Sequence, residues 1–92
     1  MTAAEHYESD IREFLSREIL FFSGDFPYTN ETSLLDEGII DSVGVLELVA
    51  FLECRFGVSV APAEATRDNF DSVRKLADYV DRKRGEQCQV EQ

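Results

Sequence analysis

An Asp-Ser pair at Asp41-Ser42 is the part of this sequence best placed to do chemistry. It stands between the apolar pair Ile39-Ile40 and a leucine-rich run with helical spacing. Asp is a preferred helix N-cap, because its side-chain oxygen accepts an otherwise unpaired backbone N–H. With Asp41 as the cap, Ser42 becomes the first helical residue. Its hydroxyl then lies beside N–H groups at the positive end of the helix dipole, a position that favours a phosphate.

An Asp-Ser pair taken alone is more often a helix start than a functional site. A serine hydrolase needs a base, and the single histidine, His6, lies in a polar N-terminal stretch. The residues before Ser42 lack the first glycine of a nucleophile elbow. No cysteines or histidines have zinc-site spacing, and the stretch 25–29 does not fit a calcium loop. We therefore expect no catalytic residues and no metal ligands, and we do not expect an enzyme.

Charge and length limit the classes of protein to consider. The 92 residues carry a formal net charge of −10, and 43% of them are apolar. These values favour one folded domain with a single core. The negative charge argues against binding of nucleic acid or of an anionic membrane, and it favours partners with basic patches. We find no signal peptide and no apolar run that could span a bilayer, so we expect a cytoplasmic monomer without membrane insertion.

Apolar residues recur at helical spacing in three segments, which predicts three main helices. The segments are about 3–20, 42–56 and 72–84. Gly57 and Gly85 are expected to end the second and third helices, because glycine readily adopts the left-handed conformation that closes a helix. Residues 1–85 are thus predicted to form one helical domain, and residues 86–92 a polar, disordered tail.

The connections predict one further short helix and one ordered loop. A helical turn is expected at 61–65, where Pro62 suits a first helical position. The connection 23–41 is long, and its apolar residues should close one end of the core. They are Phe26, Tyr28, Leu34, Leu35, Ile39 and Ile40. In the second helix, Leu46, Ala50 and Phe51 widen the apolar stripe, so this helix should be more buried than the first. The predicted fold is an all-α antiparallel bundle of three main helices and one short helix.

Two parts of the sequence resemble acyl carrier proteins. They are Leu34-Leu35-Asp36-Glu37-Gly38-Ile39-Ile40-Asp41-Ser42-Val43, with Glu47-Leu48, Leu52-Glu53 and Phe56-Gly57 after it, and Asn69-Phe70-Asp71-Ser72-Val73. The likeness covers about residues 7–84 and implies that family's four-helix bundle. It also implies that Ser42 carries a 4′-phosphopantetheine arm, donated by coenzyme A and installed by a phosphopantetheinyl transferase. The thiol of the arm would hold an acyl or aminoacyl group as a thioester.

The resemblance also implies where partner enzymes bind. Glu37, Asp41, Glu47 and Glu53 match positions at which the family presents carboxylates, and Val43 matches an apolar contact residue. The implied partners are the transferase, an acyl- or aminoacyl-activating ligase, and a downstream acyltransferase or synthase. For each glutamate, a solvated surface without a specific partner is an equally good interpretation.

Gly44 separates this sequence from the carriers of fatty-acid synthesis, which usually have an acidic residue at this position. In this respect it is more like D-alanyl and other aminoacyl carriers, or the discrete carriers of polyketide and nonribosomal peptide pathways. We therefore expect a carrier for a specialised biosynthetic pathway. A fatty-acid carrier and an unmodified helical interaction or regulatory module remain the alternatives. Glycine here costs the helix about 1 kcal/mol against Ala, and it could permit the close approach of another group.

Overall fold

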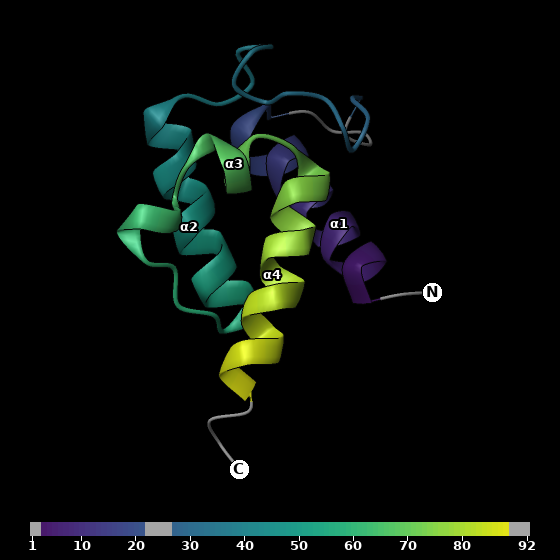
Figure 1. Ribbon diagram of the computed structural model, residues 1–92. Coiled ribbons are helices and arrows are strands. Elements are labelled where there is room, and N and C mark those ends of the chain that lie inside the picture. The colour runs from purple at the N-terminus through teal and green to yellow at the C-terminus, as the bar shows by residue number, and fades with distance from the viewer. Residues whose placement is uncertain (1–2, 22–26, 89–92) are drawn as a thin grey trace.

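The computed structural model describes residues 3–21 and 27–88, which form a small helical bundle (Figure 1). The long helices are α1 (Ala3–Phe14), α2 (Ser42–Phe56) and α4 (Val73–Cys88). The short helices are the π-helical η1 (Leu15–Ile19), the 3₁₀-helical η2 (Pro62–Glu64) and α3 (Arg67–Phe70). In Figure 1, α1 runs against α2 and α4, which both point the same way. The described residues contain no strand, and the predicted all-α fold is confirmed.

Both ends of α2 lie where the sequence predicts them. Asp41 has an extended backbone, and its Oδ1 accepts a hydrogen bond from the Gly44 N–H at 3.0 Å. Gly57 adopts the left-handed conformation at φ 71°, and its N–H donates to the Glu53 carbonyl at 3.1 Å. Each end therefore depends on a local signal that the neighbouring residues carry by themselves.

The first helical segment ends in a π-turn, which the sequence did not predict. The Leu20 N–H donates to the Leu15 carbonyl, five residues back, at 2.9 Å. The wider turn follows α1 directly and contains two buried residues, Leu15 and Ser16. Phe21 comes next with φ 53°, a left-handed conformation that is rare for a bulky residue, and its side chain is 83% exposed.

The last helix begins at a serine cap and continues past its predicted end. The Ser72 Oγ accepts a hydrogen bond from the Lys75 N–H at 3.1 Å. The prediction that Gly85 ends this helix was wrong, because α4 continues to Cys88 and Gly85 does not have a positive φ. Residues 86–88 of the predicted tail are therefore helical, whereas residues 89–92 lie outside the described part of the chain. The division at residue 85 stays a prediction.

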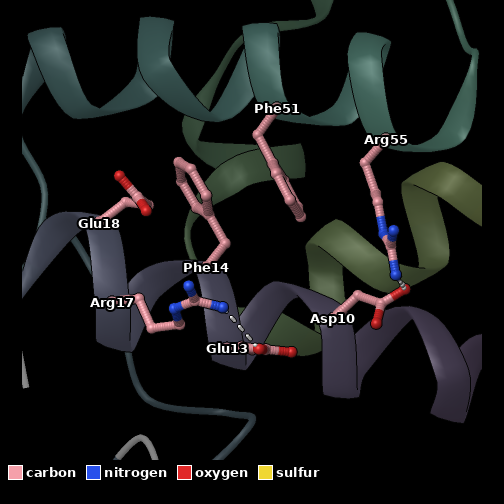
Figure 2. Close-up of a pocket in the computed structure, with 7 residues that line it drawn as sticks. All are labelled: Asp10, Glu13, Phe14, Arg17, Glu18, Phe51 and Arg55. Atoms are coloured by element: carbon pink, nitrogen blue, oxygen red, sulfur yellow. Dashed lines mark hydrogen bonds and ion pairs between the residues drawn. The ribbon is translucent and has the colours of Figure 1, made fainter. Parts of the chain in front are cut away.

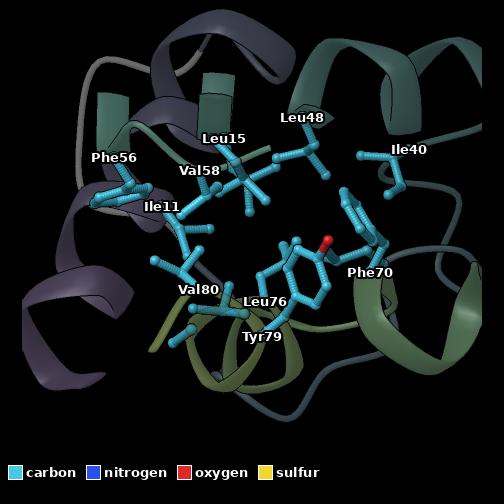
Figure 3. Packing of buried hydrophobic residues seen from close by; sticks show 14 of the residues in the cluster. Ile11, Leu15, Ile40, Leu48, Phe56, Val58, Phe70, Leu76, Tyr79 and Val80 are labelled. Carbon is cyan, nitrogen blue, oxygen red and sulfur yellow. The ribbon is translucent and has the colours of Figure 1, made fainter. Parts of the chain in front are cut away.

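One core connects every helix except η2, which has no buried residue (Figure 3). Its fully buried side chains come from α1, η1, the loop before α2, α2, α3 and α4. They are Ile11, Leu15, Leu34, Leu48, Leu52, Phe70, Val73, Leu76, Ala77, Tyr79 and Val80. Tyr79 is the polar member of this set, and its hydroxyl donates to Glu64 Oε1 at 2.7 Å. Burial and this carboxylate raise the pKa of Tyr79 above its ordinary value.

The loop before α2 crosses one end of the bundle, and its described part is well connected to the helices (Figure 1). Arg12 Nη1 donates to the Tyr28 carbonyl and to Asn30 Oδ1, both at 2.8 Å. The Arg74 N–H donates to the Asn30 carbonyl, and Arg74 Nε donates to the buried carboxylate of Glu8 at 2.7 Å. This part of the loop is thus held by polar contacts to α1 and α4.

The prediction that apolar residues of this loop close one end of the core is confirmed for the second half of the loop. Leu34, Ile39 and Ile40 are buried, and Leu35 packs against the core. Tyr28 was wrongly expected to join them, because its side chain is 37% exposed. Phe26 lies outside the described residues.

Candidate functional site

Ser42 lies exposed at the start of α2, at the end of the bundle that the loop closes (Figure 1). Asp41 caps the helix from the preceding position, and the first turn of α2 contains no acidic residue. The helix start therefore places its positive dipole end beside Ser42, although the Asp41 carboxylate already occupies the Gly44 N–H. This is the geometry that the sequence predicted for Asp41 and Ser42.

The turn that precedes Ser42 determines the path by which the chain enters α2. The Leu34 carbonyl accepts hydrogen bonds from the N–H groups of Ile39, at 2.9 Å, and Ile40, at 3.2 Å. Gly38 makes the turn possible with φ 74°, which L-amino acids other than glycine rarely adopt. The chain thus enters α2 from a hydrogen-bonded turn.

Gly44 lets Ile40 pack directly against the first turn of α2. A Cβ placed on Gly44 would lie 2.8 Å from the Ile40 Cβ, which is closer than real Cβ contacts allow. The group that approaches Gly44 is therefore a side chain of this same chain. The close packing of Ile40 accounts for the glycine at position 44, and no contact with a partner protein is needed to explain it.

Asp71 anchors the turn from the other side, and sequence reasoning missed this role. The Ser33 Oγ lies 2.8 Å from one carboxylate oxygen of Asp71 and 2.9 Å from the other, and the Leu35 N–H donates to Oδ1 at 3.2 Å. The Leu34 N–H donates to the Asp71 carbonyl at 2.6 Å. Its partners in the turn, Ser33 and Leu35, lie 38 and 36 residues away in the sequence, so no local pattern indicates this role.

Arg67 adds a second connection between α3 and this turn. Its Nη2 pairs with Asp36 Oδ1 at 2.9 Å, and its Nη1 lies 3.4 Å from Asp71 Oδ2. The hydrogen bond and charge of Arg67 lower the pKa of Asp36 from its ordinary value. Two side chains of α3 and its C-terminal end, Arg67 and Asp71, therefore support the distant turn that leads to Ser42.

The predicted partner-binding residues do not all gather around Ser42. Asp41, Val43 and Glu47 are exposed and line one groove of about 420 Å³ at the start of α2. Glu37 is exposed in the turn before Gly38. Glu53 lies eleven residues beyond Ser42, about 16 Å along the helix.

Glu53 has a structural role at the far end of α2. Its Oε2 accepts a hydrogen bond from the Val60 N–H at 3.0 Å, which holds the segment that follows Gly57. Whether Glu53 also contacts a partner remains a prediction.

The outer face of α2 is more apolar than the sequence prediction allowed. Leu46 was expected to widen the buried stripe, but its side chain is 66% exposed, and Ala50 is exposed as well. Val43, at 61% exposed, precedes Leu46 by three residues and so lies on the same face. Exposed apolar side chains that cluster on a surface mark interaction sites. The correction thus adds Leu46 to the candidate site.

Other kinds of site find no support in the described part of the chain. No group of three or more His, Cys, Asp or Glu side chains there could hold a metal ion. No helix in it is long and apolar enough to cross a membrane.

Comparison with known proteins decides the family. The model of the family described as "Phosphopantetheine attachment site" matches residues 24–80, which is more than half of the chain. The chain belongs to this family. Its cofactor is covalently attached 4′-phosphopantetheine. The start of α2 fits such a group, because it presents an exposed hydroxyl beside a helix N-terminus that has no acidic residue in its first turn.

Several curated relatives of this family member are D-alanyl carrier proteins. The protein from Abiotrophia defectiva is 38% identical over 50 residues, which cover 54% of this chain and 63% of that protein. The protein from Streptococcus thermophilus strain LMD-9 is 34% identical over 59 residues, covering 64% of this chain and 75% of that protein. The protein from Streptococcus pyogenes serotype M5 is 33% identical over 60 residues, covering 65% of this chain and 76% of that protein. The match thus spans just under two thirds of the first relative and about three quarters of the others.

Proposed function

We propose that this protein is a carrier that holds an aminoacyl or acyl group as a thioester on a 4′-phosphopantetheine arm attached to Ser42. The observation that carries the proposal is the exposed Ser42 hydroxyl at the start of α2, in a chain of the phosphopantetheine family. The similarity to D-alanyl carrier proteins favours an aminoacyl group. We propose a carrier and not an enzyme.

In this function the side chains of the protein attach and present the cargo and break no bond in it. Ser42 supplies the oxygen that is esterified, and Asp41 holds the first turn of α2 in place through the Gly44 N–H. The arm supplies the thiol that forms the thioester. Tethering raises the effective concentration of the cargo near an enzyme that binds the carrier, typically into the millimolar range.

The proposed partners act in the cytoplasm, in a specialised biosynthetic pathway. They are a phosphopantetheinyl transferase, an aminoacyl-activating ligase, and a downstream acyltransferase or synthase. Asp41, Val43, Glu47 and Leu46 surround Ser42 with carboxylates and exposed apolar side chains. Basic rims with apolar centres on the partner enzymes would complement this surface.

The attachment test measures intact mass. The protein is incubated with coenzyme A and a broad-specificity phosphopantetheinyl transferase, and we expect the mass gain of one phosphopantetheine. The gain should disappear in Ser42→Ala and persist in the matched control Ser9→Ala, which changes an exposed serine of α1. Absence of a gain, while the transferase modifies a control carrier, would contradict the proposal and favour an unmodified interaction module.

A loading test separates aminoacyl from fatty-acyl cargo. The modified protein is offered ATP with either a D-alanine-activating ligase or an acyl-activating ligase, and thioester formation is followed by mass. We expect the aminoacyl ligase to load it more efficiently. Preferential loading by the fatty-acyl ligase would assign the protein to fatty-acid synthesis instead.

A further inference from the structure

Phe21 is an exposed aromatic residue in a strained backbone conformation. It follows Leu20, the C-cap of η1, and its φ of 53° lies in the left-handed region. Helices often end on a residue in this conformation, and that residue is usually glycine, because a side chain there lies too close to the following carbonyl. Gly57 closes α2 in this way, with φ 71°. After η1 the chain instead holds a bulky side chain where glycine would be relaxed.

Packing within the protein does not account for the Phe21 side chain. The side chain is 83% exposed, so the fold gains little from its burial. The other described phenylalanines lie in or against the core and contact another aromatic ring, as Figure 2 shows for Phe14 and Phe51, whose centroids are 4.2 Å apart. Within the described part of the chain, Phe21 has no such partner. Strained residues concentrate at functional sites, so the strain at Phe21 indicates a function for its ring.

Phe21 stands beside the attachment site, although it belongs to a different part of the chain. It lines the groove of about 420 Å³ at the start of α2, together with Asp41 and Val43, the two neighbours of Ser42. Val43 is itself 61% exposed. An enzyme that covers Ser42 therefore meets an aromatic side chain from the end of η1 as well as an aliphatic side chain from the first turn of α2.

Carboxylates surround Phe21 in this groove. They are Glu18, Asp41 and Glu47. In the neighbouring hollow between α1 and α2, Arg17 pairs with Glu13 at 3.0 Å and Arg55 pairs with Asp10 at 3.2 Å, so both cations are already engaged (Figure 2). An exposed ring with carboxylates around it is complementary to an apolar pocket with a rim of Lys or Arg.

Among the proposed partners, the phosphopantetheinyl transferase must approach Ser42 most closely. The Ser42 oxygen attacks the phosphorus next to the pantetheine, the bond to the bridging oxygen of the pyrophosphate breaks, adenosine 3′,5′-bisphosphate leaves, and the serine proton passes to a base of the transferase. An enzyme that acts on the thioester instead works at the end of an arm as long as four to five extended residues, about 15 Å. The transferase is therefore the partner that has to cover the groove beside Ser42.

We infer that Phe21 is a docking residue for the phosphopantetheinyl transferase, which receives the ring in an apolar pocket with a basic rim. This inference rests on the proposed function. It extends the surface that the transferase contacts from α2 to the end of η1. The left-handed backbone at Phe21 holds the ring in solvent beside Ser42, so the strain serves recognition and not the stability of the fold.

Phe21→Gly tests the inference, because its two expected effects have opposite signs. Glycine relieves the strain at φ 53°, so the Tm should rise by about 2–5 °C. Loss of the ring removes an apolar contact with the transferase, so the KM for the carrier should rise about tenfold. The kcat should stay unchanged, because the ring contacts the enzyme and not the reacting atoms. Rates come from intact mass, with coenzyme A and the broad-specificity transferase of the attachment test.

Three further variants separate the ring from the backbone. Phe21→Asn tolerates the left-handed conformation without the flexibility of glycine, so it should raise the KM as much as Phe21→Gly. Phe21→Leu remains apolar and should keep the KM within about threefold of the wild type. Tyr28→Ala removes a partly exposed ring of the loop that does not line the groove, and it should leave the KM unchanged.

Salt distinguishes apolar docking from steering by the carboxylates. The ratio of the KM of Phe21→Gly to that of the wild type should be equal at low and high salt, because screening acts on charges. A ratio that falls with salt, an unchanged KM, or a lower Tm in Phe21→Gly would each overturn the inference. Equal modification rates of Phe21→Gly and the wild type overturn this inference alone, whereas absence of a mass gain in the wild type overturns the proposed function as well.

Discussion

The hydroxyl of Ser33 lies within hydrogen-bonding distance of both carboxylate oxygens of Asp71, at 2.8 and 2.9 Å. The two residues are separated by 38 positions in the sequence, so the contact joins the loop before α2 to the segment before α4. Leu34, next to Ser33, holds the turn that ends at Asp41. The position of Ser42 therefore depends on a buried carboxylate that lies far from it in the sequence.

Replacement of that carboxylate should loosen the start of α2. In Asp71→Asn the charge is lost from the hydrogen bonds to Ser33 and Leu35, and hydrogen bonds to charged groups contribute about 1.5–3 kcal/mol. We expect the free energy of unfolding in urea to fall by about 1–2 kcal/mol and the turn amides of Ile39 and Ile40 to exchange faster with solvent. Asp68→Asn, at an exposed position of α3, should change neither quantity. Unchanged exchange in Asp71→Asn would contradict the anchoring role.

The two glycines in helices should respond to alanine with opposite signs. In Gly44→Ala the new Cβ would lie 2.8 Å from the Ile40 Cβ, and such overpacking costs about 1–3 kcal/mol. This cost should outweigh the helix-propensity gain of about 1 kcal/mol. Gly85→Ala has nothing within 4 Å of its Cβ, so it should be stabilising by about 0.5–1 kcal/mol. Thermal unfolding checks both, and stabilisation by Gly44→Ala would contradict the packing argument.

Charge reversal should separate the roles of two glutamates on α2. Glu47→Lys changes an exposed carboxylate in the groove beside Ser42, so we expect slower association with the transferase at low salt and little change in stability. Glu53→Lys removes the acceptor of the Val60 N–H, so we expect a loss of about 1 kcal/mol of stability and a smaller effect on association. Stopped-flow kinetics at several salt concentrations and urea unfolding measure the two effects. Equal slowing by Glu47→Lys at all salt concentrations would argue against electrostatic steering.

The alkaline stability of the fold should depend on Tyr79. Burial, followed by the hydrogen bond and charge of Glu64, raises the pKa of Tyr79 above its ordinary value of 10.0. The folded state therefore binds this proton more tightly than the unfolded state does, so the contribution is fully present below about pH 10 and is lost as the pH rises further.

Removal of the hydroxyl should reduce that alkaline loss. Tyr79→Phe deletes the hydrogen bond to Glu64, which we expect to cost about 1 kcal/mol at pH 7. Urea unfolding between pH 7 and pH 11 should then show a shallower alkaline decline than in the wild type. Tyr28→Phe, at an exposed position, serves as the control, and its stability should decline with rising pH as steeply as that of the wild type. An unchanged slope in Tyr79→Phe would contradict the assignment.

The sequence predicted those features of the site that depend on neighbouring residues. The Asp41 cap and the Gly57 stop were correct, because each requires only the local backbone and one side chain. Leu46 was assigned to the core because periodicity reports only that a residue is apolar and in phase with others. It cannot show that the core-facing arc of α2 is already filled by residues such as Leu48 and Leu52.

The features that the sequence did not predict depend on distant contacts or on small changes in geometry. The role of Asp71 requires the loop and α3 to meet, and no local pattern reports that contact. The π-turn of η1 differs from an α-helix by one residue per hydrogen bond, and its apolar spacing resembles that of the helix it continues. Gly44 was correctly noted as a site of close approach, but the approaching group, Ile40, became evident only in the folded chain.

The exposure of Val43 and Leu46 has a thermodynamic consequence for every encounter of this protein. Both side chains protrude from the first turns of α2, so an enzyme that reaches Ser42 also removes them from water. Burial of apolar surface gives association a negative heat-capacity change, which calorimetry at several temperatures would record. The carboxylates at this end of the protein should determine the association rate of partner enzymes. These two apolar residues should determine the dissociation rate.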